Sequence, residues 1–326
     1  MPHVLVAGKL HPSGVARLRS AEGLTFDLID EVSEPSYAPL IDRADALILR
    51  TQPLSAATVA RAERLKLVSR HGVGYDAVDI TALNARGIAL CIVGDVNTVA
   101  VAEHAIMLIL AAVKRALKAD SAVRDPENWG WRNRLEAGEV GGKTLLVLGC
   151  GRIGRTLAGY AVALGMKVIG YDPWLERAGW PAGPLECVSS LHDGLAQADV
   201  ISVHIPKSEQ PVLGAAELMA ARPGVIIVNT ARGGIVDEEA LAAALASGHV
   251  AAAGIDVFAD EPPGRSHPLL AFDHVILSPH IAGLTAEGAE RLAVYSVQNV
   301  IDFFAGRLDP SLIVNAAGIG RHGALQ

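Results

Sequence analysis

The sequence has few of the features that define specialised classes of protein. Its 326 residues include three cysteines, Cys91, Cys150 and Cys187, without a spacing typical of a metal site. So few cysteines favour a reducing, cytoplasmic compartment. The longest apolar run, residues 106–113, is too short to span a bilayer. The N-terminus lacks the basic start and long apolar stretch of a signal peptide. We expect a cytoplasmic protein without a metal centre or membrane segment.

A positive charge excess is also absent. The net charge is −7, so neither nucleic acid nor an anionic membrane surface is expected as the main partner. A small anionic substrate remains open, because local basic residues can outweigh the global charge. The composition, 51% hydrophobic and 19% charged, is that of an ordinary globular protein. The length exceeds what one hydrophobic core usually organises, which favours two domains.

Short apolar segments alternate with amphipathic ones along nearly the whole chain, a pattern typical of parallel βα units. A helix predicted over residues 99–118 and a polar segment with Trp129 and Trp131 separate two series of strands. The predicted strands are residues 4–7, 26–30, 46–49, 67–69 and 89–93 in the first series, and 144–148, 167–171, 200–204, 225–229, 252–256 and 275–277 in the second. A last helix is predicted over residues 286–305. The pattern predicts two α/β modules joined by a long helix.

The strongest local motif is a glycine-rich turn between a predicted strand and a predicted helix. Gly149 permits a tight turn, Gly151 lets the backbone approach a pyrophosphate, and Gly154 lets the helix pack on the strand. Amides at the helix start would face the phosphate charge. The alternative is a chance turn in a glycine-rich chain. The strand before, the helix after and an acid at the end of the next strand argue for a dinucleotide site.

That acid is Asp172, which lies 18 residues beyond Gly154. Its carboxylate can accept hydrogen bonds from both adenosine ribose hydroxyls, and it would repel a 2′-phosphate. The following Pro173 and Trp174 supply no cation to bind such a phosphate. The sequence therefore predicts NAD rather than NADP.

Three later segments point to the reaction, and they read NTARGGIVDEEAL, GIDVFADEPP and LSPHIAG. With RHGVGYDAVD, AEHAIMLIL and GRIGR, they make nearly the whole chain resemble the D-2-hydroxyacid dehydrogenase family. Phosphoglycerate dehydrogenase and glyoxylate/hydroxypyruvate reductase look like the nearest branches. The resemblance implies that Arg232, Glu261 and His280 form the catalytic set.

The chemistry of a keto acid reduction makes independent sense of these residue types. An imidazolium such as that of His280 can give a proton to the developing alkoxide near neutral pH. A carboxylate such as Glu261 would hold the imidazole's tautomer and stabilise its charged form. The fork of donors on Arg232 suits a substrate carboxylate and the ketone. The structural alternatives are a strand-end arginine, a solvated loop acid and a core histidine.

The resemblance also implies a substrate site. The segment from Arg70 through Val73 and Gly74 is similar to a loop whose backbone amides grip the substrate carboxylate. Arg50 and Arg70 match positions that approach the substrate phosphate in phosphoglycerate dehydrogenases. The alternatives are a simple strand-to-helix turn and surface arginines.

Further cofactor contacts are implied by the same resemblance. Arg152 and Ile153 should touch the pyrophosphate, and Ile205 and Pro206, after His204, should flank the adenine side. The remaining implied contacts surround the nicotinamide and its ribose: Thr230, Ala231, Asp256, Ala282 and Gly283. Ile205 departs from the family, which often has a polar residue there. Residues 95–98 also replace the family's usual proline-containing turn.

Other conspicuous residues have structural interpretations. His104 on the long helix is expected to be a packing or interdomain residue rather than a catalytic one. Cys150 is expected to be a small buried thiol. Trp129 and Trp131 lie in a segment that contributes to a dimer in this family, which implies a homodimer through the NAD-binding domain.

The predicted architecture is two Rossmann-like, doubly wound parallel-sheet domains with a catalytic cleft between them. Residues 1–98 and 282–326 would form the substrate-binding domain, and residues 99–281 the NAD-binding domain. The predicted function is hydride transfer between nicotinamide and a small D-2-hydroxy or 2-keto acid, most like that of D-3-phosphoglycerate dehydrogenase.

Two alternatives to that function stay open. One is a glyoxylate/hydroxypyruvate reductase, and the other is a non-catalytic NAD-sensing protein like the corepressors built on this fold. A formate dehydrogenase is disfavoured, because removing hydride from formate needs no acid–base pair of His280 and Glu261.

Overall fold

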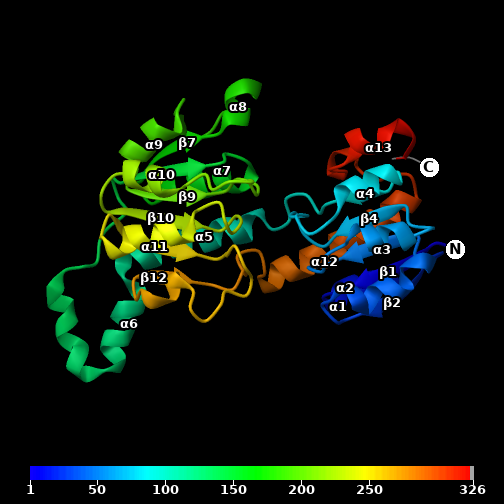
Figure 1. Cartoon of the computed structure of the whole chain (residues 1–326), viewed down its shortest axis with the longest axis horizontal. Helices are drawn as coiled ribbons and strands as arrows, with labels where there is room; N and C mark the ends of the chain where they lie inside the picture. Colours follow the sequence, from blue (N-terminus) through cyan, green and yellow to red (C-terminus); the bar gives the residue numbers. More distant parts are fainter. Residues whose placement is uncertain (324–326) are drawn as a thin grey trace. The chain divides into compact units, whose positions relative to one another are not determined.

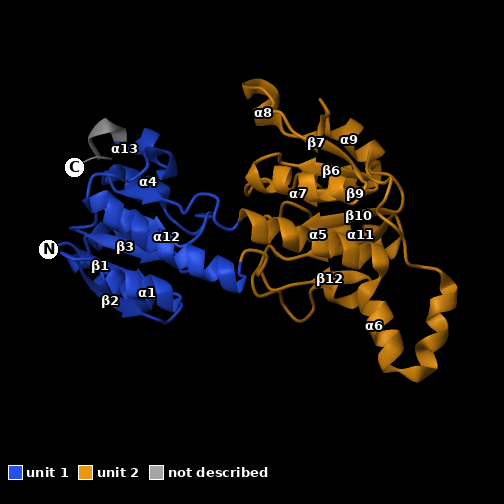
Figure 2. Cartoon of the chain, turned by 180° about the vertical axis from the view of Figure 1, so that it is seen from behind, with its two compact units in different colours: residues 1–97, 284–326 blue, residues 98–283 orange. Residues whose placement is uncertain are grey.

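The computed structural model describes residues 1–323, and the chain divides into two compact units. Unit 1 comprises residues 1–97 and 284–326, and unit 2 comprises residues 98–283 (Figure 2). The sequence predicted Thr98, Ala282 and Gly283 to be part of the substrate-binding domain. They belong to unit 2, where the Ala282 amide donates to the Asp256 carboxylate at 2.9 Å.

Unit 1 is built around a five-stranded parallel sheet in the order β2-β1-β3-β4-β5 (Figure 1). Its elements are β1 (His3–Ala7), α1 (Pro12–Arg19), β2 (Thr25–Ile29), α2 (Glu34–Tyr37), η1 (Ala38–Arg43), β3 (Ala46–Leu49), α3 (Ala56–Arg61), β4 (Leu67–Arg70), α4 (Ile80–Ala85), β5 (Ala89–Cys91), α12 (Ala286–Phe304), η4 (Pro310–Leu312) and α13 (Ala316–Gly323). Ser55, Asp79 and Thr285 start α3, α4 and α12 by accepting an amide of the first turn.

Helices cover both faces of this sheet. Alternate strand residues such as Leu5, Leu47 and Leu49 pack with η1, α3 and α4, and their neighbours pack against α1 and α12. Burial on both faces explains why the strands appear in the sequence as continuous apolar runs.

Unit 2 contains a seven-stranded parallel sheet in the order β12-β11-β10-β9-β6-β7-β8. Its elements are α5 (Thr98–Lys114), α6 (Ala116–Arg124), η2 (Pro126–Arg134), β6 (Thr144–Leu148), α7 (Arg152–Ala163), β7 (Lys167–Tyr171), α8 (Pro173–Ala178), β8 (Glu186–Cys187), α9 (Leu191–Gln197), β9 (Val200–Val203), α10 (Ala215–Ala220), β10 (Val225–Asn229), α11 (Glu238–Ala246), β11 (Val250–Ile255), η3 (Pro268–Ala271) and β12 (Val275–Leu277). One face packs against α5 and α7, and the other against α9, α10 and α11.

Each sheet has a point where the strand order reverses, and ligands of doubly wound folds bind outside the carboxyl ends of the strands there. In unit 1 this point lies between β1 and β3, and in unit 2 it lies between β6 and β9. Both sheets are parallel and doubly wound, so the predicted fold class is confirmed.

The single long helix predicted over residues 99–118 is wrong. The helix ends at Lys114, because Arg115 adopts a left-handed backbone with a φ of 52°, and α6 starts in a new direction. The Arg115 guanidinium donates to the Ala251 carbonyl at 2.9 Å and holds this break against β11.

Candidate active site

The glycine-rich turn lies at the carboxyl end of β6, beside the end of β9. Gly149 has a φ of +88°, and a Cβ there would lie 2.7 Å from the His204 carbonyl oxygen. A Cβ at Gly154 would collide with the Gly149 carbonyl oxygen and lie 2.8 Å from the Val147 side chain. Close approach of backbone to backbone therefore requires glycine at both positions.

The start of α7 is open to an anion. Gly151 is its N-cap residue, and no side chain caps the first turn. A Cβ at Gly151 would meet nothing within 4 Å. Arg152 is exposed and Ile153 half-buried. The uncapped amides and the helix dipole suit a phosphate group, as the pyrophosphate of a dinucleotide would supply.

The Asp172 carboxylate is held beside this turn at the end of β7. Its Oδ2 accepts the Cys150 amide at 2.9 Å. Its Oδ1 accepts the amides of Trp174 at 3.0 Å and Leu175 at 3.1 Å, which makes Asp172 the N-cap of α8. One carboxylate thus ties the phosphate turn to the next strand and caps a helix, a double role that its sequence position did not reveal.

Cys150 itself is buried inside this turn. A Cβ at Gly170 would lie only 2.6 Å from the Cys150 Sγ atom, so the thiol packs directly against this glycine. Burial, followed by the charge of Asp172, raises the pKa of the Cys150 thiol to about 12. This agrees with a packing role rather than a reactive one.

The structure brings together His280 and Glu261, the two side chains predicted to act as an acid–base pair. His280 Nδ1 lies 2.8 Å from Glu261 Oε2, and both side chains are partly exposed, at 48% and 38%. The other carboxylate oxygen of Glu261 accepts the Phe258 amide at 3.1 Å. Glu261 follows β11 and His280 follows the adjacent β12, so the two loops meet at one edge of the sheet.

Arg232 follows β10, the next strand along the same edge. Asn229 shapes this segment: its side chain donates to the Arg232 carbonyl at 2.9 Å and accepts the Ala231 amide at 3.0 Å. The Arg232 guanidinium donates to the Ala231 carbonyl at 2.7 Å. A Cβ at Gly233 would overlap the Phe258 carbonyl, so this segment packs directly on the loop that carries Glu261.

Two buried polar atoms near the predicted nicotinamide and adenine sites have no partner among the described residues. They are Thr230 Oγ1 and His204 Nδ1. The other ring nitrogen of His204 lies 2.8 Å from Ser202 Oγ, and burial lowers the pKa of His204 to about 4. An unpartnered hydroxyl at Thr230 is a group that a bound dinucleotide can satisfy. Together with the turn at Gly149 and Gly151, it shows that the residues present fit such a cofactor.

The other predicted cofactor residues occupy the same edge of unit 2. Ile205 packs against the hydrophobic core of unit 2, where the family often has a polar side chain, and Pro206 is exposed. The Asp256 carboxylate is fully buried and accepts the amides of Ile281 at 3.0 Å and Ala282 at 2.9 Å. Asp256 therefore acts within the protein as the anchor of the segment that carries Gly283.

In unit 1, the predicted substrate residues lie at the carboxyl ends of β3 and β4, where Arg50 follows β3 and Arg70 is the last residue of β4. Arg50 lies at the reversal point of the strand order, where a Cβ at Gly8 would be 2.8 Å from the Arg50 Cβ. Arg70 donates to the carbonyls of Gly74 at 2.7 Å and Leu49 at 3.0 Å, so part of its guanidinium shapes the loop. Val73 and Gly74 are half-buried in that loop.

His71 is the residue that the sequence analysis did not single out. It is buried, and its Nε2 has no partner among the described residues. Burial, and then the charges of Arg50 and Arg70, lower the pKa of His71 to about 4. The only signal in the sequence was its place between Arg70 and Gly72, at a strand end. The neutral imidazole of His71, with Nε2 unpartnered, thus lies near Arg50 and Arg70 at this edge of unit 1.

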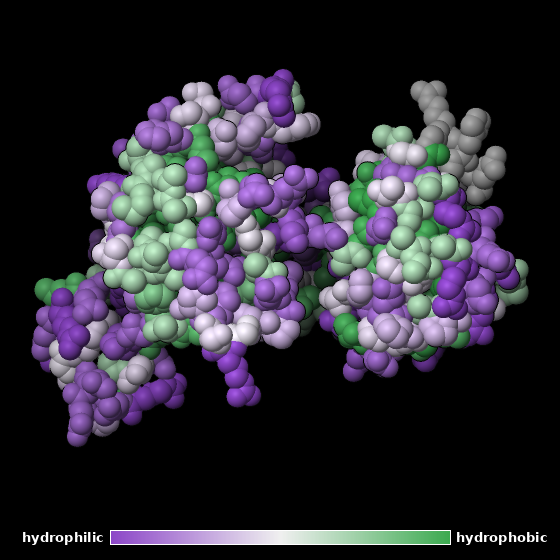
Figure 3. Space-filling model, in the orientation of Figure 1, coloured by the Kyte–Doolittle hydropathy of each residue, from purple (hydrophilic) through white to green (hydrophobic). Residues whose placement is uncertain are grey.

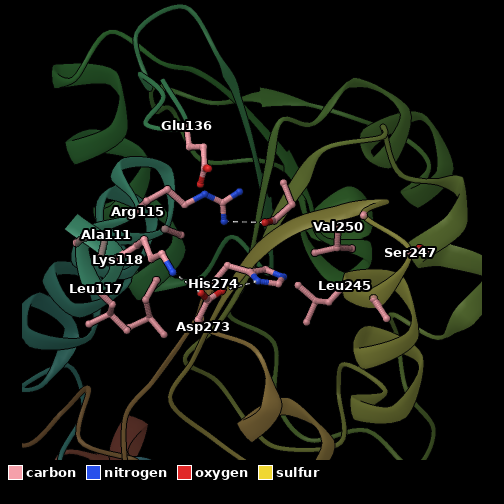
Figure 4. A pocket seen from close by; sticks show the side chains of 16 residues that line it. Ala111, Arg115, Leu117, Lys118, Glu136, Leu245, Ser247, Val250, Asp273 and His274 are labelled. Atoms are coloured by element: carbon pink, nitrogen blue, oxygen red, sulfur yellow. Dashed lines mark hydrogen bonds and ion pairs between the residues drawn. The ribbon is translucent and has the colours of Figure 1, made fainter. Parts of the chain in front are cut away.

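A cavity of about 390 Å³ adjoins the His280–Glu261 pair and is lined mainly by apolar side chains such as Phe258, Pro262 and Leu277. A second cavity, of about 470 Å³, lies at the root of α6 (Figure 4). Charged side chains that line this cavity pair with each other: Lys118 forms an ion pair with Asp273 at 3.1 Å. Nothing in residues 1–323 groups three or more His, Cys, Asp or Glu side chains as a metal site would. None of the helices in that range is long and apolar enough to cross a membrane.

The fold and the residues at the carboxyl edge of the unit 2 sheet define a class of protein. It is an α/β protein with a dinucleotide-binding unit and a histidine–carboxylate pair at the same sheet edge. The family is more specific. The model of the D-isomer specific 2-hydroxyacid dehydrogenase NAD-binding domain matches residues 106–282. The chain belongs to this family, as the sequence resemblance predicted.

Relatives with two different activities are similar to the chain. A D-3-phosphoglycerate dehydrogenase of Mycobacterium tuberculosis is 39% identical over 98% of this chain and 60% of its own length. The chain therefore spans about three fifths of that relative. A glyoxylate reductase of Aeropyrum pernix is 36% identical over 96% of both chains.

Solved structures agree with the fold. A protein from Thermus thermophilus aligns with a TM-score of 0.86 at 33% identity, covering 94% of this chain and 98% of its own. An NADPH-dependent glyoxylate/hydroxypyruvate reductase of Sinorhizobium meliloti aligns with a TM-score of 0.83 at 28% identity, over 95% and 97% of the two chains.

Proposed function

We propose that this protein is an NAD-dependent dehydrogenase that interconverts a small 2-keto acid and its D-2-hydroxy acid. The observation that supports it best is the His280–Glu261 pair, joined at 2.8 Å on the sheet edge that also carries the phosphate turn. Glu261 occupies Nδ1 of His280, which leaves Nε2 as the ring atom for proton transfer to the substrate oxygen. Bound NADH supplies the hydride.

The other residues of this edge complete the proposed chemistry. The guanidinium of Arg232 binds the substrate carboxylate and polarises the ketone. The amides at the start of α7 bind the pyrophosphate, and Asp172 binds the adenosine ribose. The hydroxyl of Thr230, which has no partner among the described residues, hydrogen-bonds to the nicotinamide end of the cofactor.

Turnover tests this proposal. Purified protein is incubated with NADH and, in turn, glyoxylate, hydroxypyruvate and 3-phosphohydroxypyruvate, and absorbance of NADH is followed. Oxidation with at least one of them is expected. NADH binding by fluorescence titration without turnover of any would instead favour a non-catalytic NAD-sensing protein.

Among these substrates we favour 3-phosphohydroxypyruvate. Arg50 and Arg70 bring two positive charges to the carboxyl edge of the unit 1 sheet, more than one carboxylate already bound by Arg232 requires. Arg70 directs two of its donors to backbone carbonyls, so Arg50 is the main candidate for the phosphate. The phosphoglycerate dehydrogenases at 39% identity support this interpretation, and the glyoxylate reductases at 36% support the alternative.

Replacing Arg50 distinguishes the two. Arg50→Gln should lower kcat/KM for 3-phosphohydroxypyruvate by about tenfold to a hundredfold, because a charge-assisted contact contributes about 1.5–3 kcal/mol. Glyoxylate, which has no distal anion, should be little affected. Arg19→Gln, at the exposed end of α1, is the control. Equal losses for both substrates, or a wild-type preference for glyoxylate, would favour the glyoxylate reductase interpretation.

NAD is proposed over NADP because the Asp172 carboxylate stands beside the phosphate turn. Asp172→Asn keeps an oxygen acceptor to cap α8 but removes the charge that repels a 2′-phosphate. We expect NADH to be preferred by the wild type and the NADPH/NADH ratio of kcat/KM to rise about tenfold or more in the variant. The Sinorhizobium meliloti reductase is NADPH-dependent, which shows that NADPH use occurs among similar proteins. Equal use of NADH and NADPH by the wild type would contradict the proposed preference for NAD.

A homodimer through unit 2 is also proposed. The arm formed by α6, η2 and the residue after η2 projects from the rest of unit 2 (Figure 1). Its surface is mostly hydrophilic, but a few apolar side chains are exposed on it (Figure 3). These side chains are Leu117, Val123, Trp129 and Leu135, exposed by 53%, 64%, 54% and 86%. Such a set on one arm gains stability when unit 2 of a second copy covers it.

Light scattering tests the dimer. The wild type should have twice the chain mass of 34.0 kDa. The double variant Val123→Asp, Leu135→Asp should be a monomer. Met219→Asp, which changes another exposed apolar side chain on α10, should remain dimeric. A monomeric wild type would contradict the proposal.

A further inference from the structure

We propose that His104 is a positioning residue for His280, acting through Ser278 and Asp256. This inference rests on the proposed function, in which His280 transfers the proton. All four residues belong to unit 2, and His104 lies on α5, far in the sequence from the loop it supports.

The backbone of His280 needs support. Its φ is 53°, a left-handed conformation that is unfavourable for a residue with a Cβ. Such a conformation persists when the surrounding contacts determine it. The His280 amide donates to the Asp256 carbonyl at 2.7 Å, which gives the first of these contacts.

The Asp256 side chain provides the next contacts. Its carboxylate has no exposed surface and accepts the amides of Ile281 at 3.0 Å and Ala282 at 2.9 Å. It also accepts the Ser278 hydroxyl at 2.5 Å. Three consecutive amides, from residues 280 to 282, therefore end on one residue, and the orientation of that carboxylate determines the orientation of the loop.

His104 sets the orientation of the Ser278 hydroxyl. The His104 Nε2 atom lies 2.9 Å from Ser278 Oγ and 3.5 Å from Asp256 Oδ1, and the side chain is 14% exposed. A hydroxyl has one proton, and Ser278 gives it to Asp256. The short contact with His104 must then be a donation from Nε2–H to Ser278 Oγ. His104 thus requires a proton on Nε2, and the chain of donors runs from His104 to Ser278 to Asp256 to the loop of His280.

A matched pair of substitutions separates this role from packing. His104→Gln places an amide N–H near the position of Nε2, whereas His104→Leu fills the space without a donor. His249→Leu is the control: His249 Nε2 also makes one hydrogen bond, to the Ala221 carbonyl at 3.0 Å, but it precedes β11 at the opposite edge of the sheet.

Kinetics with the best keto acid give the first readout. His104→Leu should lower kcat by about tenfold, because a hydrogen bond to a buried, partly charged network is lost. The Kd for NADH should stay within about twofold. His104→Gln should recover most of kcat. His249→Leu should lower stability without changing kcat. Equal kcat in His104→Leu and wild type, or no recovery in His104→Gln, would overturn the proposal.

Hydrogen exchange of the amides of residues 280–282 gives a readout that needs no activity. Exchange should be about tenfold faster in His104→Leu than in the wild type and His104→Gln, with amides of β9 unchanged. If no keto acid is turned over but exchange accelerates, the positioning role stands and the proposed function fails. If turnover is found but neither exchange nor kcat responds, the positioning role fails.

Discussion

His280 and Glu261 meet because each follows one of two neighbouring parallel strands. The loop after β11 carries Glu261, whose second oxygen is held by the Phe258 amide, and the loop after β12 carries His280. Neither side chain is fully buried, at 38% and 48% exposed. Partial exposure leaves both side chains accessible from solvent, while the Phe258 amide holds one oxygen of Glu261. The positions of the two loops, together with the carboxylate–imidazole contact, therefore bring the pair together.

Substitutions at this pair should separate chemistry from cofactor binding. His280→Ala should remove nearly all turnover, and Glu261→Gln should lower kcat by about a hundredfold or more, because an amide holds the wrong imidazole tautomer. The Kd for NADH, measured by fluorescence titration, should change little in either variant. Loss of NADH binding in parallel with kcat would mean that the pair serves the cofactor site instead.

His71 makes stability dependent on pH. Burial and the charges of Arg50 and Arg70 lower its pKa to about 4, below its ordinary value of 6.5. His71 is protonated below about pH 6.5 in the unfolded chain but only below about pH 4 in the folded chain. The stability contributed by a neutral His71 is therefore present above pH 6.5 and is lost as the pH falls toward 4.

Urea unfolding at pH 7 and pH 5 measures this effect. Between these values the wild type should lose about 1–2 kcal/mol more of its unfolding free energy than His71→Gln, which has no titrating ring. Circular dichroism follows the transition. An identical pH response in both proteins would show that His71 titrates normally in the folded state.

At the scale of elements, the turn between β6 and α7 uses its glycines for different reasons. Gly154 is required by the fold, because a Cβ there would collide with the Gly149 carbonyl oxygen. Gly151 has open space around its missing Cβ and no positive φ, so the fold itself does not require it. We propose that its requirement comes from the ligand that would approach the start of α7.

Alanine substitutions should expose this difference. Gly154→Ala should lower the unfolding free energy by about 2 kcal/mol or more and weaken NADH binding as well. Gly151→Ala should leave stability nearly unchanged and weaken NADH binding by about tenfold or more. Denaturation and fluorescence titration of both variants provide the comparison. Tight NADH binding by Gly151→Ala would place the pyrophosphate elsewhere.

Among the strands, those buried on both sides give the clearest signal in the sequence, although the partly exposed β2 was also predicted. Strands such as β1, β3, β6 and β9 appear as apolar runs because both of their faces are covered. β8 was missed, because it has two residues and both are exposed. The break between α5 and α6 was missed, because nothing about Arg115 in the sequence announces a left-handed residue.

In the candidate active site, too, some residues have a signal in the sequence and others do not. The glycine turn, Asp172 and His280 have local signals or a family resemblance, so the sequence could indicate them. The contacts of His104 with Ser278 and of Asp172 with Cys150 join residues 174 and 22 positions apart. Such pairs are determined by strand order and helix packing, which a single sequence does not specify.

At the scale of the whole molecule, the proposed NAD site is confined to unit 2. The phosphate turn, Asp172, Thr230 and the His280 loop all lie between residues 98 and 283. Unit 1 has its own two hydrophobic layers around its own sheet. A ligand stabilises whatever must be folded to bind it, so NADH should stabilise unit 2 directly.

Hydrogen exchange with and without NADH should show this difference. At a free NADH concentration of about 100 times its Kd, binding adds about 2.7 kcal/mol to the unfolding free energy of unit 2. Amides of β6 and β9 that exchange only through unfolding of the unit should then slow by about a hundredfold, whereas amides of β1 and β3 should slow far less. Gly151→Ala at the same NADH concentration is the control and should show a smaller effect. Equal slowing in both units would mean that they unfold together, and no slowing in unit 2 would contradict the proposed cofactor site.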